Sequence, residues 1–206
     1  EIPLRLVGSE MCIRDSIYTG FWNSETKDAN FVCVSATDED PDNTTETKYA
    51  TWTYAVQGGF YWAGAYVTDK YAIVGSDDGE SDSTSDSSYV YCFDKLTGEV
   101  VQKVGPHHGD IRSDISYYDG RIYFTSKGGY LYSYNLKEDG TIDTENLIEP
   151  IEIGKMSTST PAIANGRCYV GSSYGSNFSG TYGISVVDIN AETGAMNLEY
   201  VVYTDA

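Results

Sequence analysis

An eight-residue pattern occurs three times in the chain, at spacings of 50 and 46 residues. It reads DKYAIVGS from residue 69, DGRIYFTS from residue 119 and NGRCYVGS from residue 165. The Asp-Gly and Asn-Gly pairs favour a tight hairpin turn, and the residues that follow are typical of a short β-strand. A period of this length indicates a repeated unit of supersecondary structure, such as the blade of a propeller.

Other short strands recur around this pattern. We expect one before each turn, at residues 65–67, 115–117 and 161–163, and another after it, at residues 91–94, 132–135 and 185–188. A fourth, outer strand closes each unit, as at residues 99–104. The middle strands are apolar on both faces, as a sheet stacked between two others requires. The sequence therefore predicts an all-β fold, a partial β-propeller of four-stranded antiparallel blades.

The first unit is incomplete. Residues 17–20, 31–34 and 49–54 match a second, third and fourth strand, whereas no turn signal precedes residue 17. Residues 1–16 resemble translated sequencing-adaptor sequence found fused to unrelated reading frames, so we exclude them as an artefactual leader. The predicted propeller then covers residues 17–206, with blades at about 17–57, 58–105, 106–154 and 155–206.

Two segments resemble a known repeat family. Residues 90–101 (VYCFDKLTGEVV) and 130–135 (YLYSYN) resemble the core of the pyrroloquinoline-quinone-like (PQQ-like) repeat. Residues 109–113 and 157–161 resemble the blade-entry segments of propellers in large bacterial cell-surface proteins. The resemblance implies a PQQ-like β-propeller, and about four blades are fewer than such propellers usually need to close. We therefore expect an open arc, and the alternative is a complete four-bladed propeller.

Charge narrows the function classes. The chain carries 31 acidic and 13 basic residues, a formal net charge of −18. Such a surface repels phosphate backbones and anionic lipids, so we expect no nucleic-acid partner. No apolar run reaches membrane-spanning length. The abundance of tyrosine and glycine, 19 and 21 residues, is typical of secreted bacterial proteins and favours an extracellular or cell-surface location.

The cysteines give no sign of a metal or redox motif. Outside the leader they are Cys33, Cys92 and Cys168, each in an apolar run and none in a CxxC pair. We expect buried, free thiols that act as small hydrophobic residues.

The PQQ-like resemblance also includes quinone-dependent dehydrogenases. Their site holds the quinone, a calcium ion, a catalytic aspartate and, in many members, two adjacent cysteines. Because the chain has no adjacent cysteine pair, we expect neither bound PQQ nor enzymatic activity, and we assign no catalytic residue. The alternative is a fragment of a quinone-dependent alcohol or sugar dehydrogenase. His107 and His108 follow Pro106, and we expect an ordinary solvated loop pair.

A rim of polar and aromatic residues is the candidate binding site. The repeat spacing makes Trp62, Arg112 and Thr158 equivalent positions at the entrance to the first strands, which line the channel of a propeller. Their neighbours Tyr61, Asp110, Ser113, Asp114 and Ser159 complete the predicted site. An exposed tryptophan and tyrosine beside an arginine suit a sugar, a peptide or a carboxylate. We predict a non-enzymatic binding or scaffold module for a glycan, a peptide or another surface protein. The alternative for Trp62 is packing between blades.

An acidic loop in the first unit has the spacing of a calcium site. Asp38, Asp40, Asp42 and Glu46 occupy its positions one, three, five and nine, and the backbone carbonyl of Thr44 stands at position seven. Hard oxygen ligands in this number suit Ca²⁺. The loop resembles the calcium hairpins of integrin-type propellers, with asparagine in place of the turn glycine. The alternative is an ordinary acidic loop.

Overall fold

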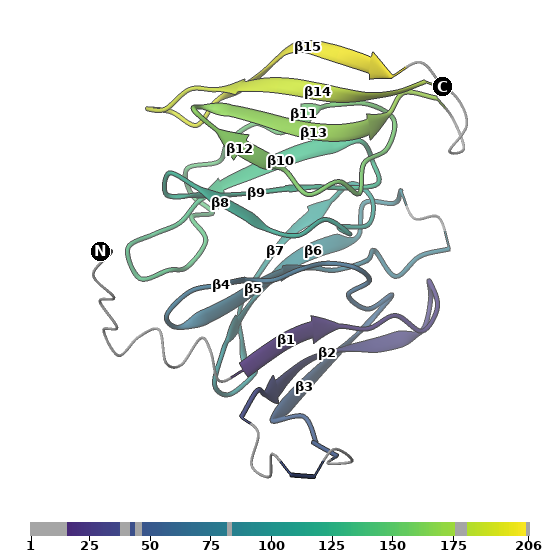
Figure 1. The fold of residues 1–206 in the computed structure, drawn as a ribbon, viewed down its shortest axis with the longest axis vertical. Coiled ribbons are helices and arrows are strands. Elements are labelled where there is room, and N and C mark those ends of the chain that lie inside the picture. The colour runs from purple at the N-terminus through teal and green to yellow at the C-terminus, as the bar shows by residue number, and fades with distance from the viewer. Residues whose placement is uncertain (1–15, 38–41, 44–46, 82–83, 176–180, 205–206) are drawn as a thin grey trace.

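The computed structural model describes residues 16–37, 42–43, 47–81, 84–175 and 181–204. Within these ranges the chain forms fifteen β-strands and no helix (Figure 1). The strands make four antiparallel sheets, in which consecutive strands are hydrogen-bonded neighbours. Membrane-spanning helices are absent from the described ranges.

We refer to the four sheets as blades 1 to 4 in chain order. Blade 1 contains β1 (Ser16–Gly20), β2 (Asp28–Ser35) and β3 (Trp52–Gln57). Blade 2 contains β4 (Tyr66–Val67), β5 (Tyr71–Gly75), β6 (Ser88–Asp94) and β7 (Val100–His107). Blade 3 contains β8 (Ser116–Tyr118), β9 (Arg121–Thr125), β10 (Tyr130–Asn135) and β11 (Ile151–Glu152). Blade 4 contains β12 (Ala162–Ala164), β13 (Arg167–Ser173), β14 (Tyr182–Ile189) and β15 (Met196–Thr204).

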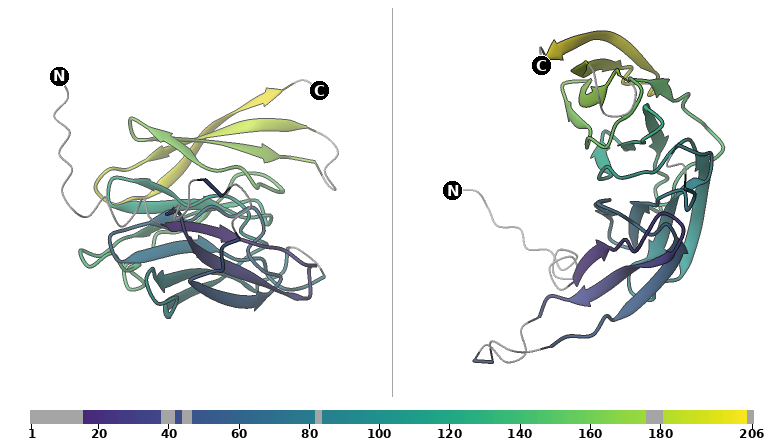
Figure 2. Two further views of the ribbon diagram at one scale, coloured as in Figure 1. Left: turned by 60° about the horizontal axis from the view of Figure 1, so that its bottom comes forward. Right: turned by 90° about the vertical axis from the view of Figure 1, so that its right-hand side faces the viewer.

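The blades follow one another along a curved arc. Figure 2 shows blade 1 and blade 4 at opposite ends of this arc, with the intervening blades stacked between them. The closed four-bladed alternative is therefore wrong for this structure. Blade 1 has three strands, as expected, and β1 begins at Ser16, which pairs with Ser35, one residue earlier than the sequence suggested.

Two of the three repeated turns have the predicted geometry. Asp119 and Gly120 have φ values of 48° and 78°, and Asn165 and Gly166 have values of 52° and 75°. Two successive positive φ angles match the twist of the flanking strands, and Asn, Asp and Gly tolerate them best. The first copy lacks glycine, and there the Thr68 hydroxyl accepts the Tyr71 N–H instead, at 2.8 Å.

One hydrophobic core fills each gap between neighbouring blades. Aromatic rings dominate the core between blades 1 and 2, where Phe31 and Phe93 stack with centroids 5.5 Å apart. Cys33 lies in this core, Cys92 in the core between blades 2 and 3, and Cys168 in the core between blades 3 and 4. All three thiols are free and buried, as the sequence predicts.

The outer face of blade 4 carries the same kind of side chain without a covering blade. Ile73 and Tyr123 are repeat equivalents of Tyr169, and both are fully buried against the next blade. Tyr169 is 40% exposed, and Ile184 and Tyr200, which lie on the same face by strand register, are 42% and 50% exposed. We call this surface the outer face of blade 4.

His107 is buried, so the expectation of a solvated pair is wrong for it. Strand β7 extends to His107 and places its ring between blades 2 and 3, with its centroid 4.8 Å from that of Tyr132. Its Nε2 is 2.8 Å from the Tyr134 hydroxyl. His108 instead lies at the surface, where its Nδ1 is 2.6 Å from the Asp86 carboxylate.

Burial of His107 predicts a loss of stability in acid. Burial lowers the pKa of His107 to about 4, whereas the unfolded chain has a pKa of about 6.5. As pH falls through this window only the unfolded state takes up the proton, so folding is penalised by roughly 2–3 kcal/mol at about pH 4.5. His107→Gln keeps a neutral group and should remove this penalty. Urea unfolding of both proteins at about pH 7 and about pH 4.5 measures it, and equal losses would contradict the prediction.

Candidate functional site

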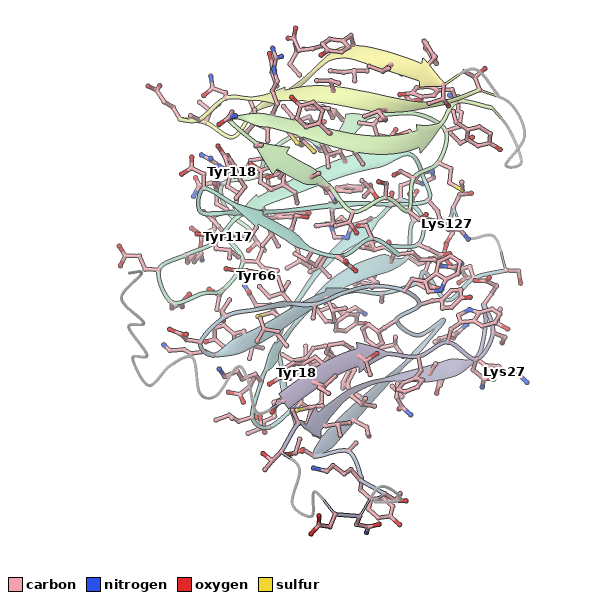
Figure 3. The ribbon with its side chains drawn as sticks, in the orientation of Figure 1. Tyr18, Lys27, Tyr66, Tyr117, Tyr118 and Lys127 are labelled. Atoms are coloured by element: carbon pink, nitrogen blue, oxygen red, sulfur yellow. The ribbon has the colours of Figure 1, made fainter. Side chains whose placement is uncertain are left out.

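Two sets of loops meet at one edge of the arc. One set leads from each blade into the next, and the other connects β1 to β2, β5 to β6 and β9 to β10. Figure 3 shows Lys27 and Lys127, from two of these loops, on one side of the molecule, and Tyr66 and Tyr117 on the other. We call this edge the entry rim. It comprises residues 21–27, 58–65, 76–81, 84–87, 108–115, 126–129 and 153–161.

Three aromatic rings form a stack where blades 1 and 2 meet at the rim. The Tyr61 centroid is 5.0 Å from that of Trp22 and 4.3 Å from that of Trp62, with interplanar angles of 22° and 25°. We call these residues the aromatic stack. They border a hollow of about 440 Å³ that also contacts Tyr18 and Gly64. Trp62 is 66% exposed, so the alternative of packing between blades is wrong.

A buried ion cluster lies beneath the stack. The Nη2 of Arg112 is 2.6 Å from an oxygen of Asp77, 2.8 Å from one of Asp110 and 2.9 Å from one of Glu25. Its Nε also donates to Asp77, and its Cζ lies 4.8 Å from the centroid of the Tyr61 ring. Glu25 comes from blade 1, Asp77 from blade 2 and Arg112 from the entry to blade 3, so one guanidinium joins three blades.

The cluster holds three carboxylates and two cations. The Lys127 ammonium is 3.2 Å from Asp110, and the Asp78 N–H donates to the same carboxylate at 2.9 Å. Burial raises the pKa of Asp77 to about 7 and that of Asp110 to about 6, although Arg112 opposes both shifts. Because every carboxylate of the cluster contacts it, Arg112 is a structural cation and cannot also receive an anionic ligand.

The three carboxylates are close enough for a metal ion. Their nearest oxygens, from Glu25, Asp77 and Asp110, all lie within 4.8 Å of one another. The guanidinium of Arg112 occupies the point at which they converge, within 2.6–2.9 Å of each. The residues therefore fit an internal ion pair and do not fit a metal site.

The remaining predicted rim residues near Arg112 have separate roles. Ser113 is buried, and its Oγ accepts the Thr125 N–H at 2.9 Å. Asp114 is exposed, and its carboxylate packs against Gly64, since a methyl group added there would lie 2.2 Å from the Asp114 Oδ1. Asp114 thus contacts Gly64, which lines the hollow of the aromatic stack, whereas Ser113 binds strand β9.

Thr158 and Ser159 lie apart from the aromatic stack. They border a second hollow of about 320 Å³ next to the outer face of blade 4, together with Tyr182 and Ile184. The Ser159 Oγ accepts the Gly171 N–H at 3.2 Å. The structure therefore divides the predicted rim residues between an aromatic hollow, a buried ion cluster and this second hollow.

Most of the predicted calcium ligands lie outside the described residues. These are Asp38, Asp40, Thr44 and Glu46. Only Asp42 is described, and it is exposed. Calcium binding at this loop stays a prediction.

Trp22, Glu25, Asp77 and Lys127 are absent from the predicted site. A spacing of 50 residues, the first repeat offset, makes Asp77 and Lys127 equivalent positions just after a second strand. Because these equivalent positions carry opposite charges, the repeat could have indicated both residues as candidates for an ion pair at the rim. Trp22 and Glu25 lie in a loop of blade 1 that has no repeated counterpart in the sequence.

Comparison with known proteins identifies the fold. No family model and no curated protein matches the sequence. The solved structure of BamB from Moraxella catarrhalis matches with a TM-score of 0.53 and 17% identity over 91% of this chain and 50% of that one. The β-propeller domain of Cps50 (Swd1) from Myceliophteria thermophila matches with a TM-score of 0.53 and 9% identity, over 90% and 55% of the two chains. This chain is a partial β-propeller.

The expected fold class is therefore confirmed. The partial propeller spans about half the length of both of these solved structures. A quinohemoprotein alcohol dehydrogenase from Pseudomonas putida HK5 gives a lower TM-score of 0.47, with 19% identity over 70% of this chain and 20% of that one. Similarity at these levels of identity establishes the fold, and the function has to be argued from the site.

Proposed function

We propose that this partial propeller is a non-enzymatic binding or scaffold module of the PQQ-like type, located outside the cell or at its surface. The observation that carries the proposal is the aromatic stack, in which Trp62 is 66% exposed and has a φ of 60°. Bulky residues rarely adopt positive φ, and strained residues concentrate at ligand sites. A ligand that packs on the Trp62 ring accounts for both its exposure and its strained backbone.

The ion cluster narrows the ligand class. Arg112 is surrounded by Glu25, Asp77 and Asp110, so it is not available to receive the carboxylate ligand that the sequence allowed. Exposed indole faces still suit a glycan or a peptide, because both present flat or cationic surfaces to aromatic rings. A glycan, a peptide or a peptide segment of another surface protein is therefore the proposed partner.

Two assays test this proposal against the dehydrogenase alternative. With added PQQ and calcium, we expect no reduction of a redox dye by alcohols or aldose sugars. On glycan and peptide arrays, we expect binding that Trp62→Ala removes and Tyr49→Ala leaves intact, since Tyr49 is 88% exposed and lies off the entry rim. Robust dye reduction would support the dehydrogenase, and array binding unchanged in Trp62→Ala would place the ligand elsewhere.

We further propose that residues 38–46 bind calcium, on the ligand spacing of the sequence. At a calcium concentration of about 100 times the Kd, the Tm should rise by about 5–10 °C, because binding to the folded state alone contributes about 2.7 kcal/mol. Asp40→Ala should abolish the rise, while Asp69→Ala, at an exposed acid elsewhere, should not. Titration calorimetry that detects no binding at millimolar calcium would show an ordinary acidic loop.

A further inference from the structure

The aromatic stack has ring surface available to a cation. Trp62 and Trp22 are 66% and 41% exposed, and the hollow beside them measures about 440 Å³. A guanidinium or ammonium over a tryptophan face gains roughly 0.5–2 kcal/mol. The stack already accepts one such group from within the protein, because the Arg112 guanidinium carbon lies 4.8 Å from the Tyr61 centroid.

The backbone holds Trp62 outward among neighbours that turn inward. Phe60 is fully buried in the core between blades 1 and 2, and Ala63 is buried in the same cluster. Trp62, between them, takes a φ of 60° and projects its ring onto Tyr61 at the rim. A residue in this conformation costs of order 1–3 kcal/mol, which the surrounding structure has to offset. The ring therefore lies at the rim, stacked on Tyr61, in the structure without a ligand.

An acidic side chain lies next to the hollow. Asp114 contacts Gly64, one of the residues that line the hollow, and among the described residues its carboxylate has no hydrogen bond or ion pair. Arg112 and Lys127 are held in the ion cluster by Glu25, Asp77 and Asp110, so Asp114 is the acid next to the hollow that these cations do not neutralise. With a net charge of −18 for the whole chain, the local field attracts cations and repels anions.

We infer that the hollow binds a cationic side chain, arginine or lysine, from a partner peptide. The faces of Trp62 and Trp22 take the cation, and Asp114 provides the opposite charge. This inference rests on the proposed function and specifies its ligand. A neutral sugar would use the same rings but would leave Asp114 without a role, and an acidic peptide would be repelled.

The test uses the full chain and a matched pair of peptides. One is a pentapeptide with two arginines, and the other has the uncharged isostere citrulline at both positions. Titration followed by tryptophan fluorescence should show binding of the arginine peptide, at least about 5-fold tighter than the citrulline peptide. Raising sodium chloride from about 0.05 M to about 0.5 M should weaken the arginine peptide by a similar factor, because salt screens exposed charges.

Variants separate the contributions of the rings and the charge. Trp62→Ala should weaken arginine-peptide binding about 10-fold, Trp62→Phe less, and Asp114→Asn about 3-fold. Tyr49→Ala should leave it unchanged. Urea unfolding shows whether each variant is folded, and a loss of binding counts only in a folded variant.

The outcomes distinguish this inference from the proposed function. Equal, salt-independent binding of both peptides would overturn the cationic ligand, as would binding of a neutral oligosaccharide alone with loss in Trp62→Ala. Either result would leave the binding module standing. Arginine-peptide binding that Trp62→Ala and Asp114→Asn do not alter would overturn the site. Absence of binding to either peptide, with no Trp62-dependent array ligand, would overturn both.

Discussion

Replacing Arg112 by methionine is expected to lower the free energy of unfolding by about 3–5 kcal/mol near neutral pH. Methionine has a similar length but no charge, so the carboxylates of Glu25, Asp77 and Asp110 would converge on an apolar group. Lys127, at 3.2 Å from Asp110, would be the one cation left among these described residues. The penalty comes from buried carboxylates without a partner.

The penalty should shrink as the solution becomes more acidic. Burial raises the pKa of Asp77 to about 7 and that of Asp110 to about 6 with Arg112 present, and loss of its charge raises both further. The carboxyl groups of the folded variant therefore take up protons at a higher pH than those of the folded parent chain, so the stability difference between the two proteins decreases as pH falls from about 7 to about 5. Urea unfolding at both pH values measures this change.

Arg167 provides a matched control. Its Nε is 2.6 Å from Asp188, but the two side chains are 44% and 39% exposed. Arg167→Met should cost at most about 1 kcal/mol, because solvent screens an exposed ion pair. Asp77→Asn added to Arg112→Met should recover part of the loss. A cost below about 1 kcal/mol for Arg112→Met, or one that grows in acid, would contradict our account of the cluster.

Features that recur could be predicted from the sequence, and features assembled from single loops could not. The turn at Asp119-Gly120 and its counterparts fix the period, and the period alone assigns Tyr123 and Tyr169 to one position in successive blades. The period also makes Trp62, Arg112 and Thr158 equivalent positions, but the structure places them in three different surroundings. Glu25 and Asp77, however, lie 87 and 35 positions before Arg112 in the chain, and only the stacking of blades brings them together.

The two alternatives for Trp62 show a second reason why the site could not be fully predicted from the sequence. The sequence does not distinguish an indole packed between blades from one exposed at the rim, because tryptophan occurs in both environments. The structure decides between them, since Trp62 has a φ of 60° and is 66% exposed. His107 is a similar case, since its burial depends on how far strand β7 continues past Pro106.

The 206-residue chain is expected to self-associate through the outer face of blade 4. This face exposes Tyr169, Ile184 and Tyr200. In blades 2 and 3 the equivalent face is covered by the next blade. We expect a second copy to cover this face with its own, because two-fold contacts between identical surfaces are the most common kind. Sheets with apolar faces pack readily face to face.

Charged substitutions should dissociate the pair. Ile184→Asp combined with Tyr200→Asp places four like charges in a two-fold interface and should give monomers at concentrations where the parent chain associates. Sedimentation velocity over about 1–100 μM measures the difference, a range that spans typical micromolar affinities. Leu96→Asp, at an exposed turn of blade 2, is the control and should not dissociate the pair. A parent chain that stays monomeric throughout this range would contradict the prediction.

The placement of one free cysteine in each core gives the chain a set of internal reporters. Cys33, Cys92 and Cys168 each lie between a different pair of blades. Burial raises the pKa of Cys92 and Cys168 to about 12, so neither thiol is ionised enough to be alkylated while its core is closed. In a Cys12→Ser background, the alkylation rates of Cys92 and Cys168 therefore measure how often their gaps open. Cys33 is 2% exposed, so its alkylation reports opening of the gap between blades 1 and 2. Mass spectrometry of the labelled chain can then give the order in which the blades separate.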